Sequence, residues 1–292
     1  MKQKKIITPN ELSFMRWLAI ALIGMIACVI ISAPLTPYLL NDTDTINGIP
    51  YNSFFGLILY IPLFWATVLA IKFIGKTSLK DFILGVGGKF NFKSSILVFV
   101  LMVIGVFSAQ LLVIDNIRLR EVEFEKFEFL VVYMLLVAWM QTTWEELIFR
   151  GIFIRWACKN NVGFTKKSLI VGVISSLVFI VPHISNPEVT TQSGPMLVLV
   201  LFAYMFSGFA LYVADLHFKS LVPGIIMHWV NNFVLFTLIS GDVAAVPVPT
   251  LLVDTSTYNV PLTLLSVFIT YLPVLAYVVI DNMRKSSKSA HS

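Results

Sequence analysis

Two adjacent carboxylates and an arginine stand inside an apolar stretch of this sequence. Residues 144–151, WEELIFRG, follow the run VVYMLLVAWMQTT and contain Glu145, Glu146 and Arg150. A charged side chain at the centre of a bilayer costs about 3 kcal/mol or more, so such groups are usually paired and usually functional. A partly desolvated carboxylate is a good acceptor for a proton and can serve as a general base.

Helical spacing separates the roles of the two acids. Glu146 and Arg150 are four residues apart with the acid on the N-terminal side, which is the favourable order for an ion pair within a helix. Glu145 is rotated from Glu146 by about 100° around the helix axis. Arg150 can therefore neutralise one carboxylate while the other faces elsewhere. We interpret Glu145 as the base and Glu146 with Arg150 as a supporting pair.

Further along the chain, His228 and Asn232 are also four residues apart and project from one face of a helix. An imidazole and an amide on one face can hold a water molecule, bind a metal or donate to an oxyanion. His183 adds a second imidazole, and Pro182 before it weakens the local helical hydrogen bonding.

Depth in the membrane gives a partial check on this grouping. Counted from the nearest basic loop at 1.5 Å per residue, Glu145 lies roughly 15 Å deep and His228 with Asn232 roughly 13 to 20 Å deep. On the same count His183 lies roughly 24 Å deep, which leaves its place in a shared site open.

The elements that must position these residues are membrane helices. The chain of 292 residues is 58% hydrophobic and 13% charged, with a mean hydropathy of +0.86. A soluble domain is near half apolar and a quarter charged. The composition therefore predicts an all-α, polytopic membrane protein. Eight apolar windows approach the roughly 20 residues that a bilayer crossing needs: 15–38, 54–74, 95–115, 128–150, 168–185, 195–215, 221–240 and 260–281.

Lysine and arginine predict the orientation, because cytoplasmic loops retain positive charge. The two chain ends and the loops after the second, fourth and sixth windows hold 17 of the 21 basic residues. We therefore expect both termini in the cytoplasm and an integral protein of the cell membrane. The net charge of +5 and the pI near 9.1 fit this topology and anionic lipid headgroups. Nucleic acid is not an expected partner.

No low-complexity block or long linker divides the chain, so we expect one helical domain with three parts. Residues 1–127 hold three helices almost free of ionisable groups and read as a scaffold. Residues 128–240 hold the buried charges and histidines and read as the catalytic core. Residues 241–292 hold the last helix and a basic cytoplasmic tail. The connector at 77–92 is predicted to rest on the membrane surface.

Each polar residue also has a plain structural explanation. Intramembrane histidines often bond neighbouring helices, and Glu146 with Arg150 could be a buried strut. Six such residues on three helices favour one shared site instead. The sequence has no H-E-x-x-H helix, no G-x-S-x-G elbow and no P-loop. An ion-coupled transporter would also use intramembrane acids, but it predicts inverted repeats or matching broken helices, and we see neither.

At these residues the sequence resembles the CAAX prenyl protease and bacteriocin-processing (CPBP, Abi) family of intramembrane endopeptidases. The family pattern is E-E-x-x-x-R, then F-x-x-x-H, then H-x-x-x-N. The motifs stand here in the same order, as Glu145-Glu146-x-x-x-Arg150, Phe179-x-x-x-His183 and His228-x-x-x-Asn232. Each motif alone is weak, whereas three in register are strong. The resemblance covers about residues 128–240.

The resemblance implies an eight-helix endopeptidase that cleaves a peptide bond in a membrane-embedded or lipid-anchored protein. It implies that the residue at Glu145 activates the hydrolytic water. It gives four residues a place in the catalytic site and two a supporting role: Glu145, His183, His228 and Asn232, with Glu146 and Arg150.

Two questions stay open at this stage. A divalent metal such as zinc, bound by Glu145, His183 and His228, and a metal-free arrangement both suit these residues. We lean to the metal-free chemistry. The alternative function is a non-proteolytic bacteriocin-immunity or regulatory membrane protein with the same fold.

Overall fold

The computed structural model describes residues 14–32, 34, 45–46, 49–50, 55–85, 90–113, 117–119, 124–158, 162–241, 252–254 and 259–290. Its long helices are α1 (Phe14–Ser32), α3 (Phe55–Phe73), α5 (Phe92–Val113), α6 (Phe124–Glu146), α8 (Lys166–Ile180), α10 (Gly194–Phe218), α11 (Val222–Phe233) and α12 (Val260–Ala290). Each predicted apolar window overlaps one of them. Shorter helices are α4 (Leu79–Leu84), α7 (Ile152–Cys158) and α9 (Pro187–Thr190).

Within the described ranges, four helical segments are long and apolar enough to cross a membrane: Phe92–Leu112, Lys166–His183, Gly194–Phe218 and Val260–Lys288. They support an integral membrane protein with a helical fold, as expected. Helix α6 carries both site carboxylates, and α11 has only 12 α-helical residues. The count of eight crossings therefore stays a prediction.

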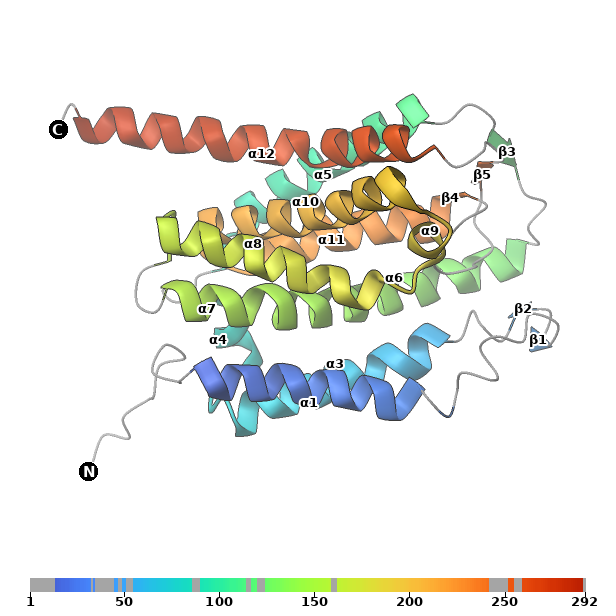
Figure 1. The fold of residues 1–292 in the computed structure, drawn as a ribbon, viewed down its shortest axis with the longest axis horizontal. Helices are drawn as coiled ribbons and strands as arrows, with labels where there is room; N and C mark the ends of the chain where they lie inside the picture. The colour runs from blue at the N-terminus through green and yellow to red at the C-terminus, as the bar shows by residue number, and fades with distance from the viewer. Residues whose placement is uncertain are drawn as a thin grey trace.

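The long helices run alternately in opposite directions through one bundle (Figure 1). Helices α1 and α3 pack together on one side, α12 packs on α5 and α10 on the other, and α6, α8, α10 and α11 lie between them. Lysines mark one end of this bundle: Lys72 in the last turn of α3, Lys166 at the start of α8, Lys219 after α10 and Lys288 near the end of α12.

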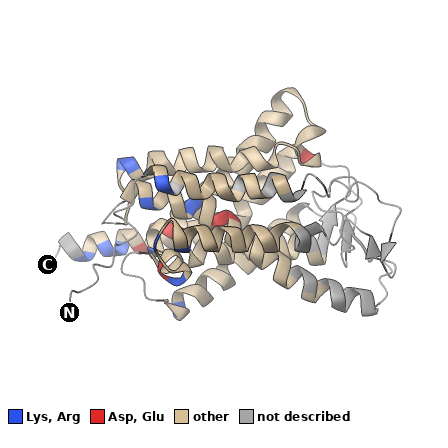
Figure 2. Ribbon diagram, turned by 90° about the horizontal axis from the view of Figure 1, so that it is seen from below, with Lys and Arg blue, Asp and Glu red and all other residues tan. Residues whose placement is uncertain are grey.

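Figure 2 shows the same charge asymmetry across the described part of the chain, with Lys and Arg gathered at the end where α12 finishes. This asymmetry is the one from which the orientation was predicted. Which end faces the cytoplasm stays a prediction, and the terminal residues 1–13 and 291–292 lie outside the described ranges.

At the other end of the bundle lie five short strands of two or three residues each: β1 (Thr45–Ile46), β2 (Ile49–Pro50), β3 (Ile117–Leu119), β4 (Ile239–Gly241) and β5 (Leu252–Asp254). Strand β1 pairs with β2, and β5 pairs with β3 on one side and β4 on the other. They connect helices and contribute no layer of their own.

Helix α4, within the connector predicted to rest on the membrane surface, docks on the bundle through one face; residues 86–89 of the connector lie outside the described ranges, and its position at the membrane surface stays a prediction. Phe82 is fully buried, and it lies so close to Gly151 that a Cβ there would approach its Cε1 to 2.5 Å. The Arg155 guanidinium lies 3.7 Å from the centre of the Phe82 ring and donates to the Phe82 carbonyl. The Leu221 N–H donates to the Ile83 carbonyl at 2.9 Å. Buried Arg155 needs acceptors, and α4 supplies them.

The apolar core has two main clusters, and the packing of the bundle places polar side chains at their boundary. Ile148 and Phe179 belong to a cluster that includes side chains of α1, α3 and α4. Met227 and Val230, on either side of His228, belong to a cluster built with α5, α10 and α12. The site is therefore enclosed by apolar packing from both halves of the molecule.

The docking of α4 is testable through Arg155. We expect Arg155→Met to lower the free energy of unfolding by about 2 kcal/mol, because buried backbone carbonyls lose a charged donor. It should also speed tryptic cleavage after the exposed Lys80 on α4, measured on the detergent-solubilised protein. Arg284→Met, at an exposed position on α12, is the control. Equal cleavage rates for both variants would contradict the docking role.

Candidate active site

The helices that carry the three motifs depart from α-helical geometry beside their polar residues. Helix α6 continues without a break into the π-helical turn Leu147–Gly151, and α11 continues into the π-helical turn Val234–Leu238. Helix α8 ends at Ile180 in the 3₁₀ turn Val181–His183. The weakening expected at Pro182 is thus present. Single π turns inside helices are frequent at functional sites.

The π turn on α6 is supported by the neighbouring helix. The Ser175 hydroxyl on α8 donates to the Phe149 carbonyl in the turn, and Ser175 is fully buried. Backbone groups freed at membrane depth need such partners, because lipid offers none. The π-helical segment between Glu146 and Arg150 is therefore stabilised by a specific contact with α8.

Glu146 and Arg150 form the ion pair that their spacing predicts. Glu146 Oε1 lies 3.1 Å from Arg150 Nη1, and both side chains are fully buried. The guanidinium carbon of Arg150 also lies 4.0 Å from the centre of the Phe179 ring. The cation is thus held between a carboxylate and an aromatic face, which compensates for lost hydration.

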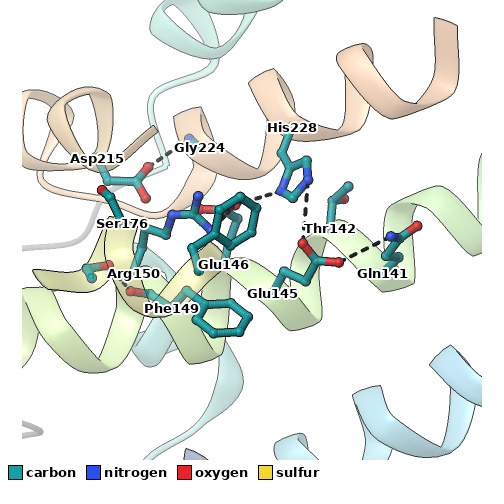
Figure 3. Close-up of polar contacts among 12 residues, drawn as sticks. Gln141, Thr142, Glu145, Glu146, Phe149, Arg150, Ser176, Asp215, Gly224 and His228 are labelled. Atoms are coloured by element: carbon teal, nitrogen blue, oxygen red, sulfur yellow. Dashed lines mark hydrogen bonds and ion pairs between the residues drawn. The ribbon is translucent and has the colours of Figure 1, made fainter. Parts of the chain in front are cut away.

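His228 reaches across from α11 and lies between the two carboxylates (Figure 3). Its Nδ1 is 2.8 Å from Glu146 Oε1, and its Nε2 is 3.6 Å from Glu145 Oε2. An ionised carboxylate only accepts hydrogen bonds, so Nδ1 carries the proton shared with Glu146. Glu146 therefore orients the imidazole, and Nε2 faces Glu145. The spacing along α6 predicts only Arg150 as a partner of Glu146. It cannot predict His228, because His228 comes from the opposing helix.

The Glu145 carboxylate keeps one oxygen free of hydrogen bonds to the described side chains. Gln141, one helical turn earlier, donates from Nε2 to Glu145 Oε1 at 3.2 Å. Oε2 accepts no hydrogen bond from described residues and has His228 Nε2 as its ion-pair neighbour. Glu145 is 4% exposed, so this oxygen is a desolvated proton acceptor.

The Phe179 ring lies next to both His183 and His228, so it connects His183 to the group formed by Glu145, Glu146 and His228. The ring centre of Phe179 is 4.6 Å from that of His183 and 5.9 Å from that of His228. His183 Nδ1 donates to the Phe179 carbonyl at 2.8 Å, which leaves Nε2 available. The charged or ionisable groups near His183 include Glu145 and Arg150. The depth count left the place of His183 open, and the contacts of the Phe179 ring now put His183 near the other polar residues.

Asn232 lies one turn beyond His228 on α11, as its spacing predicts, and is buried. Its Oδ1 accepts from Asn231 Nδ2 at 3.3 Å. No hydrogen bond joins Asn232 to Glu145 or His228 in the described structure, so its place in the chemistry stays a prediction.

Gln141 within this site and Asp215 next to it were not predicted from the sequence, and neither was the contact that Phe179 makes. Gln141 had a visible signal, because it stands four residues before Glu145. Asp215 is an acid within the apolar helix α10, and it is 1% exposed. Phe179 was noted as part of a motif, but its contact with Arg150 depends on how α8 packs against the π turn. No pattern along the chain reveals that contact.

Only two of the three predicted metal ligands, Glu145 and His228, lie where they could bind one ion. Zinc holds its ligand atoms about 2.0 to 2.2 Å away, so Glu145 Oε2 and His228 Nε2, 3.6 Å apart, suit one ion. Glu146 at Nδ1 also matches the carboxylate that often supports a metal-bound histidine. In the described residues, however, no three His, Cys, Asp or Glu side chains form a group able to hold a metal. The three-ligand site with His183 is not formed in this arrangement.

Comparison with protein families finds a match that covers this region. Residues 127–234 match the family model described as type II CAAX prenyl endopeptidase, Rce1-like. The match spans all three motifs and confirms the resemblance inferred from them. No curated protein and no solved structure matches the chain.

The geometry predicts unequal effects on stability when each of the two neighbouring carboxylates is replaced. Glu146→Gln leaves Arg150 without its counter-charge, so we expect a loss of about 3 to 5 kcal/mol in the free energy of unfolding. Glu145→Gln keeps the size of the side chain and removes no ion pair with Arg150, so its thermal unfolding should stay close to that of the parent protein. Thermal unfolding followed by tryptophan fluorescence measures both. Equal destabilisation would contradict the division of roles.

Proposed function

We propose that the chain is an intramembrane endopeptidase, similar to CAAX proteases, that hydrolyses a peptide bond in a membrane-embedded or lipid-anchored protein. The observation that carries the proposal is the buried imidazole of His228, held at Nδ1 by Glu146 with Nε2 toward Glu145. The match of residues 127–234 to the Rce1-like model supports the class of reaction.

Glu145 is the proposed general base. Its free Oε2 accepts a proton from a water molecule, whose oxygen then adds to the carbonyl carbon of the scissile peptide bond. The protonated Glu145 later returns the proton to the departing amine nitrogen. Gln141, donating to Oε1, keeps the carboxylate in place while Oε2 reacts. General acid and base catalysis of this kind contributes typically 10² to 10⁴-fold.

His228 is the proposed stabiliser of charge in the transition state. When its Nε2 carries a proton, it donates toward the oxygen that becomes negative in the tetrahedral intermediate. The positive imidazole is itself stabilised by Glu146, which accepts from Nδ1. This use of a buried acid to orient and support a histidine is the logic of the acid in a serine protease triad.

His183 and Asn232 are proposed to complete the site around the same intermediate. The free Nε2 of His183 is fixed by the bond from Nδ1 to the Phe179 carbonyl. Asn232 follows His228 on the same face of α11 and offers an amide donor. A second donor is valuable because removal of one oxyanion donor typically costs 10² to 10³-fold in rate.

The first test identifies the substrate and the activity together. We expect membrane fractions from cells making the parent protein to contain cleaved protein termini that are absent when Glu145→Gln is made instead. On a cleaved protein so identified, Glu145→Gln should lower kcat about 1000-fold, because it removes the base. His183→Ala and His228→Ala should also lose activity.

His217→Ala is the matched control for the histidine variants. His217 lies on α10 and pairs with Asp281 at 3.0 Å, outside the site. Properly inserted Glu145, His183 and His228 variants that cleave like the parent protein would rule out this function. Retention of a cellular phenotype by those variants would favour a non-proteolytic immunity or regulatory role.

The metal question has its own test. Because the described histidines and acids do not form a three-ligand group, we expect cleavage by the purified protein to persist after dialysis against 1,10-phenanthroline. Metal content is measured on the same sample by mass spectrometry. Loss of cleavage on chelation, with recovery on addition of zinc but not of calcium, would establish a metal-dependent reaction instead.

A further inference from the structure

We propose that Asp215 is a positioning residue. By accepting a hydrogen bond from the Gly224 N–H, it fixes the position of α11 along its axis and thereby keeps His228 beside Glu146. The inference rests on the proposed function only in that it gives His228 a catalytic role. The contact itself is seen in the structure, and its proposed effect on the orientation of His228 can be tested without any activity.

The first observation is a buried cap between two helices. Asp215 lies three residues before the end of α10, and Gly224 is the third residue of α11. Asp215 Oδ1 accepts from the Gly224 N–H at 2.7 Å (Figure 3). The first backbone N–H groups of a helix have no partner within it, and an acid at this end is favourable. Asp215 thus supplies from α10 the acceptor that α11 lacks.

The second observation is that the space beside the Asp215 carboxylate admits only glycine at position 224. A Cβ at position 224 would approach Asp215 Oδ2 to 2.6 Å and its carboxyl carbon to 2.9 Å. Any residue other than glycine must push this carboxylate away. The close approach of the carboxylate to the backbone therefore depends on glycine at position 224.

The third observation is the geometry that links this contact to the site. Gly224, His228 and Asn232 are spaced by four residues and lie along one face of α11. His228 lies one turn, about 5.4 Å of rise, from the capped end. Beyond Phe233 the helix continues into the π turn, so the end of α11 with regular α-helical geometry is the one that Asp215 binds. A shift of α11 by about 1 Å would break the 2.8 Å bond between His228 and Glu146.

A different role for Asp215 must be separated from this one. Its electrostatic neighbours are Glu146, Arg150 and Arg155, so its negative charge could act on the buried ion pair instead of on α11. The two roles need different chemistry. A cap requires only an oxygen acceptor, whereas charge compensation requires the ionised carboxylate.

The experiment uses the full chain in detergent with ¹⁵N-labelled histidine. The sequence has four histidines, and the His228 signals are assigned by their loss in His228→Gln. The tautomer with a proton on Nδ1 is the spectroscopic sign of the bond to Glu146. Thermal unfolding is measured on every variant. Cleavage is measured in phosphatidylcholine liposomes with a quenched fluorescent peptide that ends in a prenylated cysteine followed by three further residues.

Four variants separate the outcomes. Asp215→Asn keeps an acceptor for Gly224 and should retain the His228 signal and a kcat within about threefold of the parent, because Asp and Asn are comparable caps. Asp215→Leu and Gly224→Ala should lose the signal and lower kcat about 100-fold with little change in KM, as small misplacements do. Asp281→Leu, a matched change outside the site, should behave like the parent.

The proposal is overturned if Asp215→Leu keeps the Nδ1 signal of His228. It is also overturned if Asp215→Asn fails like Asp215→Leu, since the charge would then be the essential feature. If Asp215→Leu does not fold, Gly224→Ala decides, and failure of both to fold overturns the proposal because the contact would then support the whole fold. If the parent protein cleaves nothing, the proposed function fails while the His228 signals still test the positioning.

Discussion

The carboxylate of Glu146 is the group on which the arrangement of this site depends. It is fully buried, and one oxygen faces both the Arg150 guanidinium and the His228 imidazole. A single negative charge therefore neutralises the cation on its own helix and fixes a ring from the opposing helix. Because Glu146 binds both Arg150 and His228, the neighbouring Glu145 needs no cationic partner. Glu145 therefore keeps one carboxylate oxygen available to accept a proton. The difference between two chemically identical side chains comes from what surrounds them.

Three helix irregularities make this crowding possible. The π turn after Glu146 changes the direction in which the following side chains leave α6, and Arg150 there meets the ring of Phe179. Phe179 in turn lies beside His183, at the end of α8, and beside His228, on α11. One aromatic ring thus contacts a residue from each of the three motifs. The phenylalanine is the common surface against which the polar groups are arranged.

Much of this organisation follows from the sequence, and the remainder has a physical explanation. Hydropathy predicts the long helices, because burial in lipid requires apolar residues wherever the chain crosses. Spacing predicts the pairing of Glu146 with Arg150, because both lie on one helix. The contact of His228 with both acids depends on how α11 packs against α6, so no spacing reveals it. The same holds for Asp215, whose partner is a backbone N–H, and for α4, whose acceptors are backbone carbonyls.

The bond between α4 and the start of α11 also bears on how the protein is made. Ser220 and Ile83 are 137 positions apart in the chain, and Leu221 bonds to the same carbonyl. During synthesis the carbonyl of Ile83 emerges long before its partners exist. The polar side chains of α6 and α11 can therefore meet only after the seventh long helix has been made, so a shorter chain at the ribosome does not yet hold the complete group.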